Sequence, residues 1–269
     1  MKISIVTISY NQGKFLEESI LSVLRQKSND VEYIVVDDCS SDNSRDIIMK
    51  YKKRIDHIIF NKKNIGAAAS LNTGFQKATG DILGYINSDD FFLDTALKQA
   101  KETFIKYKNL DLIYGNGFIV DEKGFVKKLF ISKDYSQKRL ELNQTLIFQQ
   151  GTFFTKNIFD GTTGFNTKNK RTWDFELFVN MVRKNINYLR VNNYFGVLRI
   201  YPGTITNQGN KKIREKHWNE IYLKYYSKKI SFIDEVIRIG IYLFDRIRPV
   251  FLFSKILSIY YNINKKKLN

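Results

Sequence analysis

Cysteine and histidine are scarce in this sequence. Among its 269 residues Cys39 is the only cysteine, and His57 and His217 are the only histidines. A single cysteine excludes an intramolecular disulfide, which suits a reducing cytosol. Two histidines argue against a histidine-rich zinc site and against a Ser-His-Asp triad. Any chemistry of this chain is therefore expected to depend on other side chains.

Long apolar runs are also missing. No apolar stretch approaches the ~20 residues that span a bilayer as a helix, and Met1 leads almost directly into a strand pattern at Ile3. We therefore expect neither a signal peptide nor a membrane span, and a protein that is soluble or lies on a membrane surface. The hydrophobic content of 43% and aromatic content of 14% indicate a folded chain. Its length allows one large domain, or one domain with an appendage.

Acidic residues are few relative to basic ones. The sequence has 44 lysines and arginines against 27 acids, a net charge of +17. Residues 208–269 alone contain 14 basic and 5 acidic residues, which is +9 of that excess. An anionic partner for this last quarter of the chain is the simplest interpretation.

Apolar runs alternate with helical patterns through the first half of the chain. Strands are predicted at residues 3–9, 31–36, 57–60 and 82–86, with helices between them, which is typical of a parallel sheet with helical crossovers. A hairpin predicted at 118–126 would make the sheet mixed. Polar clusters follow three of these strands: Ser9-Tyr10-Asn11, Asp37-Asp38 and Asn87-Ser88-Asp89-Asp90. Because ligands bind at the carboxyl ends of strands in such sheets, we expect these clusters to converge on one site.

Asp89 and Asp90 are adjacent carboxylates at the end of a buried strand pattern. Their mutual repulsion is relieved if a cation binds there, and oxygen ligands suit Mg²⁺ or Mn²⁺. The alternative interpretation is a strand end followed by an ordinary helix cap.

Two later segments have helical patterns. One begins near Trp173 and places Asp174 in its first turn, as a functional carboxylate or as an ordinary N-cap aspartate. The other is the tail, where helices are predicted at 213–226, 232–247 and 250–263. The last two of these are basic and aromatic-rich, which is typical of a helix in a lipid interface; the alternative is a helical cap packed on the sheet.

The order of these motifs resembles that of family 2 glycosyltransferases. The resemblance covers roughly residues 2–206 and depends on five segments: Val6-Thr7-Ile8-Ser9-Tyr10-Asn11, Val35-Val36-Asp37-Asp38, Asn64-Ile65-Gly66, Gly80-Asp81 with Asn87-Ser88-Asp89-Asp90, and Trp173-Asp174-Phe175-Glu176-Leu177. It implies an α/β fold of GT-A type: a Rossmann-like, mostly parallel mixed sheet flanked by helices. A C-terminal helical extension follows. We accordingly divide the chain into a GT-A domain at 1–207 and a basic amphipathic extension at 208–269.

The resemblance also implies roles for individual residues. A nucleotide-sugar site would be formed by Thr7, Tyr10, Asp38, Asn64, Gly66, Asn87 and Ser88. Within it, Thr7 and Tyr10 would flank the base and Asp38 would accept a hydrogen bond from it, as in enzymes that use UDP sugars. Asn87 replaces the first aspartate of the family's Asp-x-Asp motif, which leaves Asp89 and Asp90 as the contacts of Mn²⁺ or Mg²⁺.

Asp174 matches the family's catalytic base. In an inverting transfer this carboxylate, which its helix N-terminus should keep ionised, takes the proton of the acceptor hydroxyl. Glu176, two residues on, is a weaker candidate. Gln149, Gln150 and Trp173 match the acceptor side, and Tyr201 stands where relatives commonly have a histidine.

The leading hypothesis from the sequence is thus a metal-dependent inverting glycosyltransferase of cell-surface glycan synthesis. It would use a UDP-linked or similar donor and a lipid-linked or polysaccharide acceptor, on the cytoplasmic face of a membrane that the basic tail contacts. A nucleotidyltransferase of similar fold is one alternative, although no glycine-rich triphosphate loop follows the first strand. A nucleic-acid-binding protein is another, but no recognised motif supports it and we expect no nucleic acid partner.

Overall fold

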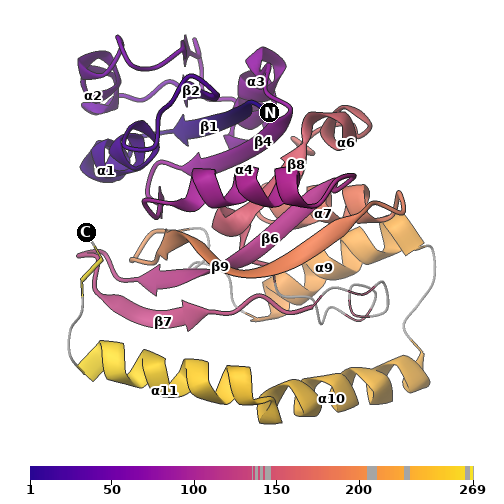
Figure 1. Ribbon diagram of the computed structural model, residues 1–269. Helices are drawn as coiled ribbons and strands as arrows, with labels where there is room; N and C mark the ends of the chain where they lie inside the picture. Colours follow the sequence, from indigo (N-terminus) through magenta and orange to yellow (C-terminus); the bar gives the residue numbers. More distant parts are fainter. Residues whose placement is uncertain are drawn as a thin grey trace.

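The protein is built around one mixed β-sheet with helices on both faces (Figure 1). The computed structural model describes residues 1–134, 136, 139, 142, 147–204, 211–226, 231–263 and 267–268. Its sheet has nine strands, eight of them in the order β3-β2-β1-β4-β8-β6-β9-β5, while β7 pairs with β6. The expected mixed α/β fold is confirmed.

The first half of the chain forms the parallel part of the sheet. It contains β1 (Ile3–Ser9), α1 (Gly13–Leu24), β2 (Val31–Asp37), α2 (Ser44–Lys50), β3 (His57–Phe60), α3 (Ala67–Lys77) and β4 (Ile82–Asn87). β1 lies between β2 and β4, with Ser9 opposite Asp37 and Ile8 opposite Asn87. The carboxyl ends of these three strands therefore meet at one edge, as predicted.

The second half adds mainly antiparallel pairs. Its elements are β5 (Phe91–Phe92), α4 (Ala96–Lys106), β6 (Leu112–Val120), β7 (Val126–Phe130), the 3-10 turn η1 (Gln149–Gly151), β8 (Thr152–Thr155), α6 (Lys156–Asp160), α7 (Trp173–Val182) and β9 (Tyr188–Arg199). The predicted hairpin is the β6–β7 pair, and β9 runs parallel to β6.

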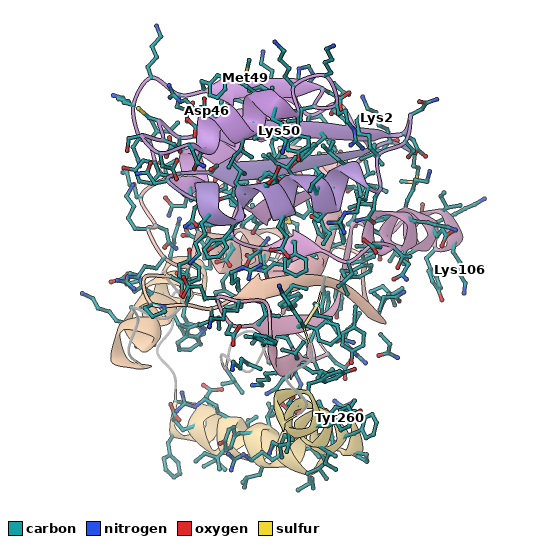
Figure 2. The ribbon with its side chains drawn as sticks, turned by 90° about the vertical axis from the view of Figure 1, so that its left-hand side faces the viewer. Lys2, Asp46, Met49, Lys50, Lys106 and Tyr260 are labelled. Carbon is teal, nitrogen blue, oxygen red and sulfur yellow. The ribbon has the colours of Figure 1, made fainter. Side chains whose placement is uncertain are left out.

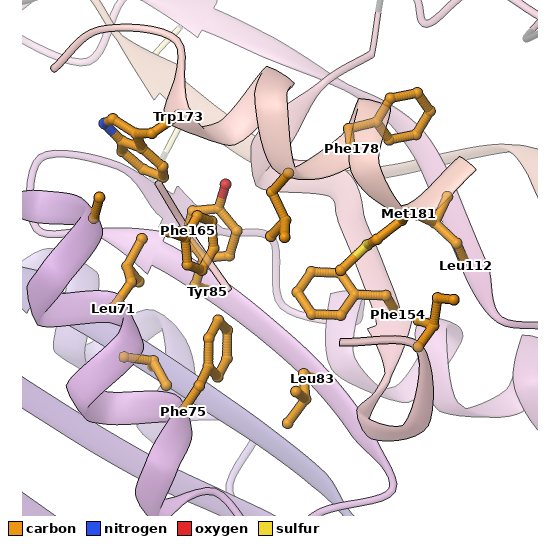
Figure 3. Packing of buried hydrophobic residues seen from close by; sticks show 14 of the residues in the cluster. Leu71, Phe75, Leu83, Tyr85, Leu112, Phe154, Phe165, Trp173, Phe178 and Met181 are labelled. Carbon is orange, nitrogen blue, oxygen red and sulfur yellow. The ribbon is translucent and has the colours of Figure 1, made fainter. Parts of the chain in front are cut away.

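The hydrophobic core has two layers because successive strand residues point to opposite faces of the sheet. On β4, Leu83 and Tyr85 belong to one layer while Ile82 and Ile86 belong to the other. The first layer is rich in aromatic rings, which α3 and α7 cover (Figure 3). Tyr85 packs there against Phe165 and Trp173, with ring centroids 5.3 and 5.9 Å away. In this layer, Trp173 at the start of α7 packs on Tyr85 near the end of β4.

Three helices follow the sheet: α9 (Lys211–Tyr226), α10 (Phe232–Ile247) and α11 (Pro249–Ile263). They confirm the helices predicted for the tail. α9 packs on the aromatic layer through Ile221, which is 5% exposed. α10 and α11 form a separate layer at the bottom of Figure 1, where α11 contacts β7. No helix in the described part of the chain has the length and apolar character to cross a membrane.

The proposed boundary at 207/208 lies outside the described residues. The helix just beyond it, α9, is nevertheless packed into the core of the sheet domain. We therefore describe α9 together with that domain, and α10 and α11 as the outer layer.

Candidate active site

A cavity of about 320 Å³ lies at the edge where β1, β2 and β4 end. Its walls include most residues predicted to hold the nucleotide sugar and the metal: Tyr10, Asp38, Asn64, Gly66, Asn87, Ser88, Asp89 and Asp90. Trp173 from α7 and Tyr201 after β9 complete it. The structure thus brings together residues that are up to about two hundred positions apart in the sequence. We call this the donor cavity.

Thr7 does not contact the donor cavity, which corrects its predicted role. Its side chain is fully buried, and its hydroxyl accepts a hydrogen bond from the hydroxyl of Tyr33 at 3.0 Å. Ile8 and Ser9 line the cavity instead. The Oγ of Ser9 is enclosed and has no hydrogen-bond partner among the described residues. Thr7 and Ser9 lie on the same face of β1, because side chains two residues apart on a strand point the same way, but only Ser9 is at the carboxyl end of the strand, beside the cavity.

Asp38 organises the loop that borders the donor cavity. Its carboxylate accepts hydrogen bonds from Asn61 Nδ2 at 2.9 Å and from the backbone N–H groups of Ile65 at 2.9 Å and Gly66 at 2.7 Å. Gly66 has φ +89°, a conformation that favours glycine. The predicted contact of Asp38 with a base would therefore be made by a carboxylate that already holds this loop.

Asp90 is held from three sides. Its carboxylate accepts hydrogen bonds from the backbone N–H of Arg199 at 2.9 Å, from Gln150 Nε2 at 2.7 Å and from Asn87 Nδ2 at 3.4 Å. Burial and the neighbouring charge of Asp89 raise its pKa well above the ordinary value. Asp90 is thus the supporting residue of the pair, and Asp89 is better placed to contact a metal.

Asp89 accepts a hydrogen bond from the Tyr201 hydroxyl at 3.1 Å through Oδ2. Burial raises the pKa of Asp89, and burial together with Asp89 raises the pKa of Tyr201 to about 12. The described residues contain no cluster of three or more metal-ligating side chains. One carboxylate beside a buried acid still fits Mg²⁺ or Mn²⁺, which often use one or two carboxylates together with substrate phosphates.

Arg199 is an important residue that the sequence did not single out. It is 3% exposed, and its guanidinium donates to the backbone oxygens of Asp89 at 3.1 Å and Glu122 at 3.0 Å. It also pairs with Glu18 and lies 4.8 Å from the ring of Phe15. These partners come from three separate segments, so no local pattern could have indicated them. Arg199 fixes the position of the Asp89-Asp90 loop.

Asp174 lies in a second cavity, of about 350 Å³, together with Gln149. We call this the Asp174 cavity. Asp174 is in the first turn of α7, as predicted, and its Oδ1 accepts the N–H of Phe175 at 2.8 Å. Burial raises its pKa, which opposes the effect expected from the helix N-terminus. A raised pKa brings a carboxylate closer to the range of an effective general base.

Two pairs of consecutive residues, Trp173-Asp174 and Gln149-Gln150, lie between the two cavities. Trp173 lines the donor cavity and Asp174 the second one. Gln150 bonds to Asp90, whereas Gln149 lines the Asp174 cavity and donates to the backbone oxygen of Tyr85 at 3.2 Å. Asp174 therefore lines a different compartment from Asp89, and the two compartments are neighbours through these consecutive residues. Glu176 points away from both carboxylate sites, toward Lys224 of α9.

The model of a protein family, Glycosyl transferase family 2, matches residues 4–169. This chain belongs to that family. It is 30% identical over 141 residues to the UDP-Glc:alpha-D-GlcNAc-diphosphoundecaprenol beta-1,3-glucosyltransferase WfgD of Escherichia coli, covering 52% of the chain and 55% of WfgD. It is 27% identical over 241 residues to the poly(ribitol-phosphate) beta-N-acetylglucosaminyltransferase TarP of Staphylococcus aureus, covering 85% of the chain and 73% of TarP. The chain spans about half the length of several curated relatives, from 40% of the glycosyltransferase alr2836 of Nostoc sp. to 55% of WfgD.

Solved structures support the GT-A fold of the glycosyltransferase. TarS 1-349 of S. aureus in complex with UDP-GlcNAc superimposes with a TM-score of 0.61 at 16% identity, over 84% of this chain and 71% of TarS 1-349. The mannosyltransferase PcManGT of Pyrobaculum calidifontis, in complex with GDP-Man and Mn²⁺, gives 0.63 at 13% identity, over 99% and 76%. At these identities the similarity concerns the fold alone.

Proposed function

We propose that this glycosyltransferase transfers a sugar, with inversion, from a UDP-linked donor to a hydroxyl of a lipid-linked or polysaccharide acceptor in cell-surface glycan synthesis. The main support is the position of Asp174, a half-buried carboxylate of raised pKa next to the cavity that Asp89 lines. The relatives agree with this proposal, since the name of WfgD specifies a UDP-Glc donor and a diphosphoundecaprenol acceptor.

In the proposed reaction, the acceptor hydroxyl lies against Asp174. Asp174 accepts its proton as the oxygen attacks the anomeric carbon, and the bond from that carbon to the diphosphate breaks with its electron pair. Ser9 Oγ and the loop held by Asp38 would contact the nucleotide, with Tyr10, Asn64, Gly66, Asn87 and Ser88 around it. A divalent cation, Mn²⁺ or Mg²⁺, would supply positive charge to the departing diphosphate, and Asp89 would hold it with support from Asp90.

Product analysis tests this function. The purified protein is first screened against nucleotide sugars with Mn²⁺ or Mg²⁺ for thermal stabilisation. With a stabilising donor we expect release of the nucleoside diphosphate, which Asp174→Asn lowers by about 10³-fold or more while donor affinity stays within twofold. Asp160→Asn, at an exposed carboxylate, is the matched control. Release of the sugar 1-phosphate instead would indicate nucleotidyl transfer, and loss of donor binding in Asp174→Asn would contradict the assigned role.

We also propose that α10 and α11 attach the enzyme to the cytoplasmic face of an anionic membrane. Both helices turn polar residues toward the protein. Asp245, 3% exposed, accepts two hydrogen bonds from Arg139 at 2.9 and 3.0 Å, and Ser258 Oγ accepts the N–H of Leu129 of β7 at 3.0 Å. Burial raises the pKa of Asp245, but the bonds from Arg139 and Lys133 outweigh it and hold the pKa below its ordinary value.

Many large apolar side chains of these helices are exposed. Those that are large and exposed are Phe232, Ile233, Val236, Ile237, Ile239, Tyr242, Leu243, Phe244, Ile247, Leu252, Phe253, Ile256, Ile259 and Tyr260. Figure 2 shows Tyr260 projecting from this layer. Nearby Arg238, Arg246 and Lys255 match anionic lipid, at about 1 kcal/mol for each basic residue near the surface. A helix on the surface of a soluble protein turns its apolar side chains toward the protein and its polar ones toward water. The reverse arrangement here fits contact with a lipid surface.

Vesicle sedimentation tests the attachment. We expect the protein to sediment with vesicles containing phosphatidylglycerol, and Phe232→Ser with Ile247→Ser to reduce the bound fraction several-fold. Ile105→Ser, at a similarly exposed residue of α4, is the control. A stable dimer in light scattering that the same double substitution dissolves, without vesicle binding, would assign the surface to a second copy of the chain.

A further inference from the structure

The Asp174 cavity is much more apolar than a sugar requires. Its polar lining residues are Asp174, Gln149, Thr152 and Thr172, and the rest of the wall is mainly apolar, with Leu112, Ile147, Phe154, Phe175, Leu177, Phe178, Met181 and Trp218. A sugar ring can place a C–H face on an aromatic ring, but the hydroxyls around its edge each need a hydrogen-bond partner when they are buried. These walls offer few partners, whereas they match an alkyl chain well.

α9 supplies one wall of this cavity from outside the region of family resemblance. Trp218 is 7% exposed and lines the cavity, and Tyr222, one turn further on, is 3% exposed. Lys224 of the same helix donates to Glu176 of α7 at 2.6 Å. The acceptor compartment is therefore completed by the helix that precedes the proposed membrane-binding layer.

We infer that the Asp174 cavity binds the apolar part of the acceptor, close to the attacking hydroxyl. The acceptor is thus an amphiphile, a lipid-linked sugar or glycolipid, and not the end of a free polysaccharide. This inference rests on the proposed function and narrows its acceptor to one class. A hydroxyl delivered by such a molecule would meet Asp174, which shares this mostly apolar compartment with the polar residues Gln149, Thr152 and Thr172.

The two tryptophans allow the cavities to be observed separately. Trp173 lines the donor cavity and Trp218 the Asp174 cavity, and the chain has no other tryptophan. In Trp173→Phe, the fluorescence of Trp218 is titrated with methyl, hexyl and octyl β-glucosides below their micellar concentrations. We expect no change with the methyl glycoside and an affinity for the others that rises about fourfold per added methylene. Equal affinity for the three glycosides would overturn the inference.

A matched pair of variants excludes binding to the exposed layer. Phe175→Ala removes a ring from the Asp174 cavity, and Phe253→Ala removes one from α11, where Phe253 is 61% exposed. Calorimetry on the otherwise unaltered protein should show octyl glucoside affinity lowered about tenfold by Phe175→Ala and unchanged by Phe253→Ala. The reverse result would place the alkyl chain on the outer layer and refute the inference.

The same samples separate this inference from the function it rests on. UDP is titrated into Trp218→Phe, in which Trp173 reports on the donor cavity. Binding of UDP without binding of alkyl glucosides would overturn only the amphiphilic acceptor. Failure to bind any nucleoside diphosphate or nucleotide sugar would remove the proposed function itself.

Discussion

The carboxylate of Glu176 joins α9 to the catalytic part of the molecule. It is 3% exposed and accepts hydrogen bonds from Asn166 Nδ2 at 2.9 and 3.0 Å, from Asn169 Nδ2 at 2.8 Å and from Lys224 Nζ at 2.6 Å. Burial raises its pKa, but the bonds from Lys224, Asn169 and Asn166 outweigh burial and lower the pKa below 4.5. This residue is thus the main polar link between α9, α7 and the loop before α7.

Glu176→Gln should lower the free energy of unfolding by about 2 kcal/mol. The substitution keeps the shape of the side chain but removes a charge-assisted hydrogen bond, which contributes about 1.5–3 kcal/mol. Lys224 is 54% exposed and stays solvated, which places the loss in the lower part of that range. At about 2–4 °C per kcal/mol for a chain of this size, the melting temperature should fall by about 4–8 °C.

Calorimetry and the emission of Trp218 measure the effect. Glu220→Gln on the same helix is the control, since its carboxylate is 58% exposed and pairs with His217. Such a surface pair contributes less than about 1 kcal/mol. Because the pKa of Glu176 is lowered in the folded state, its contribution is present above pH 4.5 and is lost as the pH falls through the folded pKa. Melting temperatures within 1 °C of each other for the two variants at pH 7 would refute this description of α9.

Three further predictions concern the donor side and the opposite edge of the sheet. Asp89→Ala should weaken metal-dependent UDP binding by about tenfold or more, measured by calorimetry with and without Mn²⁺, while unchanged metal dependence would place the metal elsewhere. Ser9→Ala should weaken UDP binding severalfold, whereas Thr7→Val should lower only the melting temperature; the opposite pattern would restore the original role of Thr7. Burial raises the pKa of Glu32, but hydrogen bonds, first of all the one from Lys2, lower it to about 2. Glu32→Gln should therefore lower the free energy of unfolding by about 2–3 kcal/mol at pH 7, and by progressively less as the pH falls from 4.5 toward 2. Urea unfolding at each pH measures this.

The sequence predicted the donor cavity more accurately than the chemistry inside it. Asp38 and Asp89 follow strand patterns that pair in parallel, so their meeting could be foreseen from periodicity alone. The different roles of Asp89 and Asp90 could not be predicted, because they depend on the hydrogen bonds that Gln150 and Arg199 donate to Asp90, and these two residues are distant in the sequence. The raised pKa of Asp174 likewise depends on burial, a property of the packed molecule.

The sequence by itself determined three features: the order of strands and helices, the polar residues at the strand ends and the basic character of the tail. Each of them follows from local periodicity and composition. Only the tertiary structure decided that Ser9 and not Thr7 faces the ligand cavity, that α9 completes the compartment around Asp174, and that many large apolar side chains of α10 and α11 are exposed. The physical reason is that these outcomes depend on which surfaces pack together, and contacts between distant segments leave no signal in any short stretch of chain.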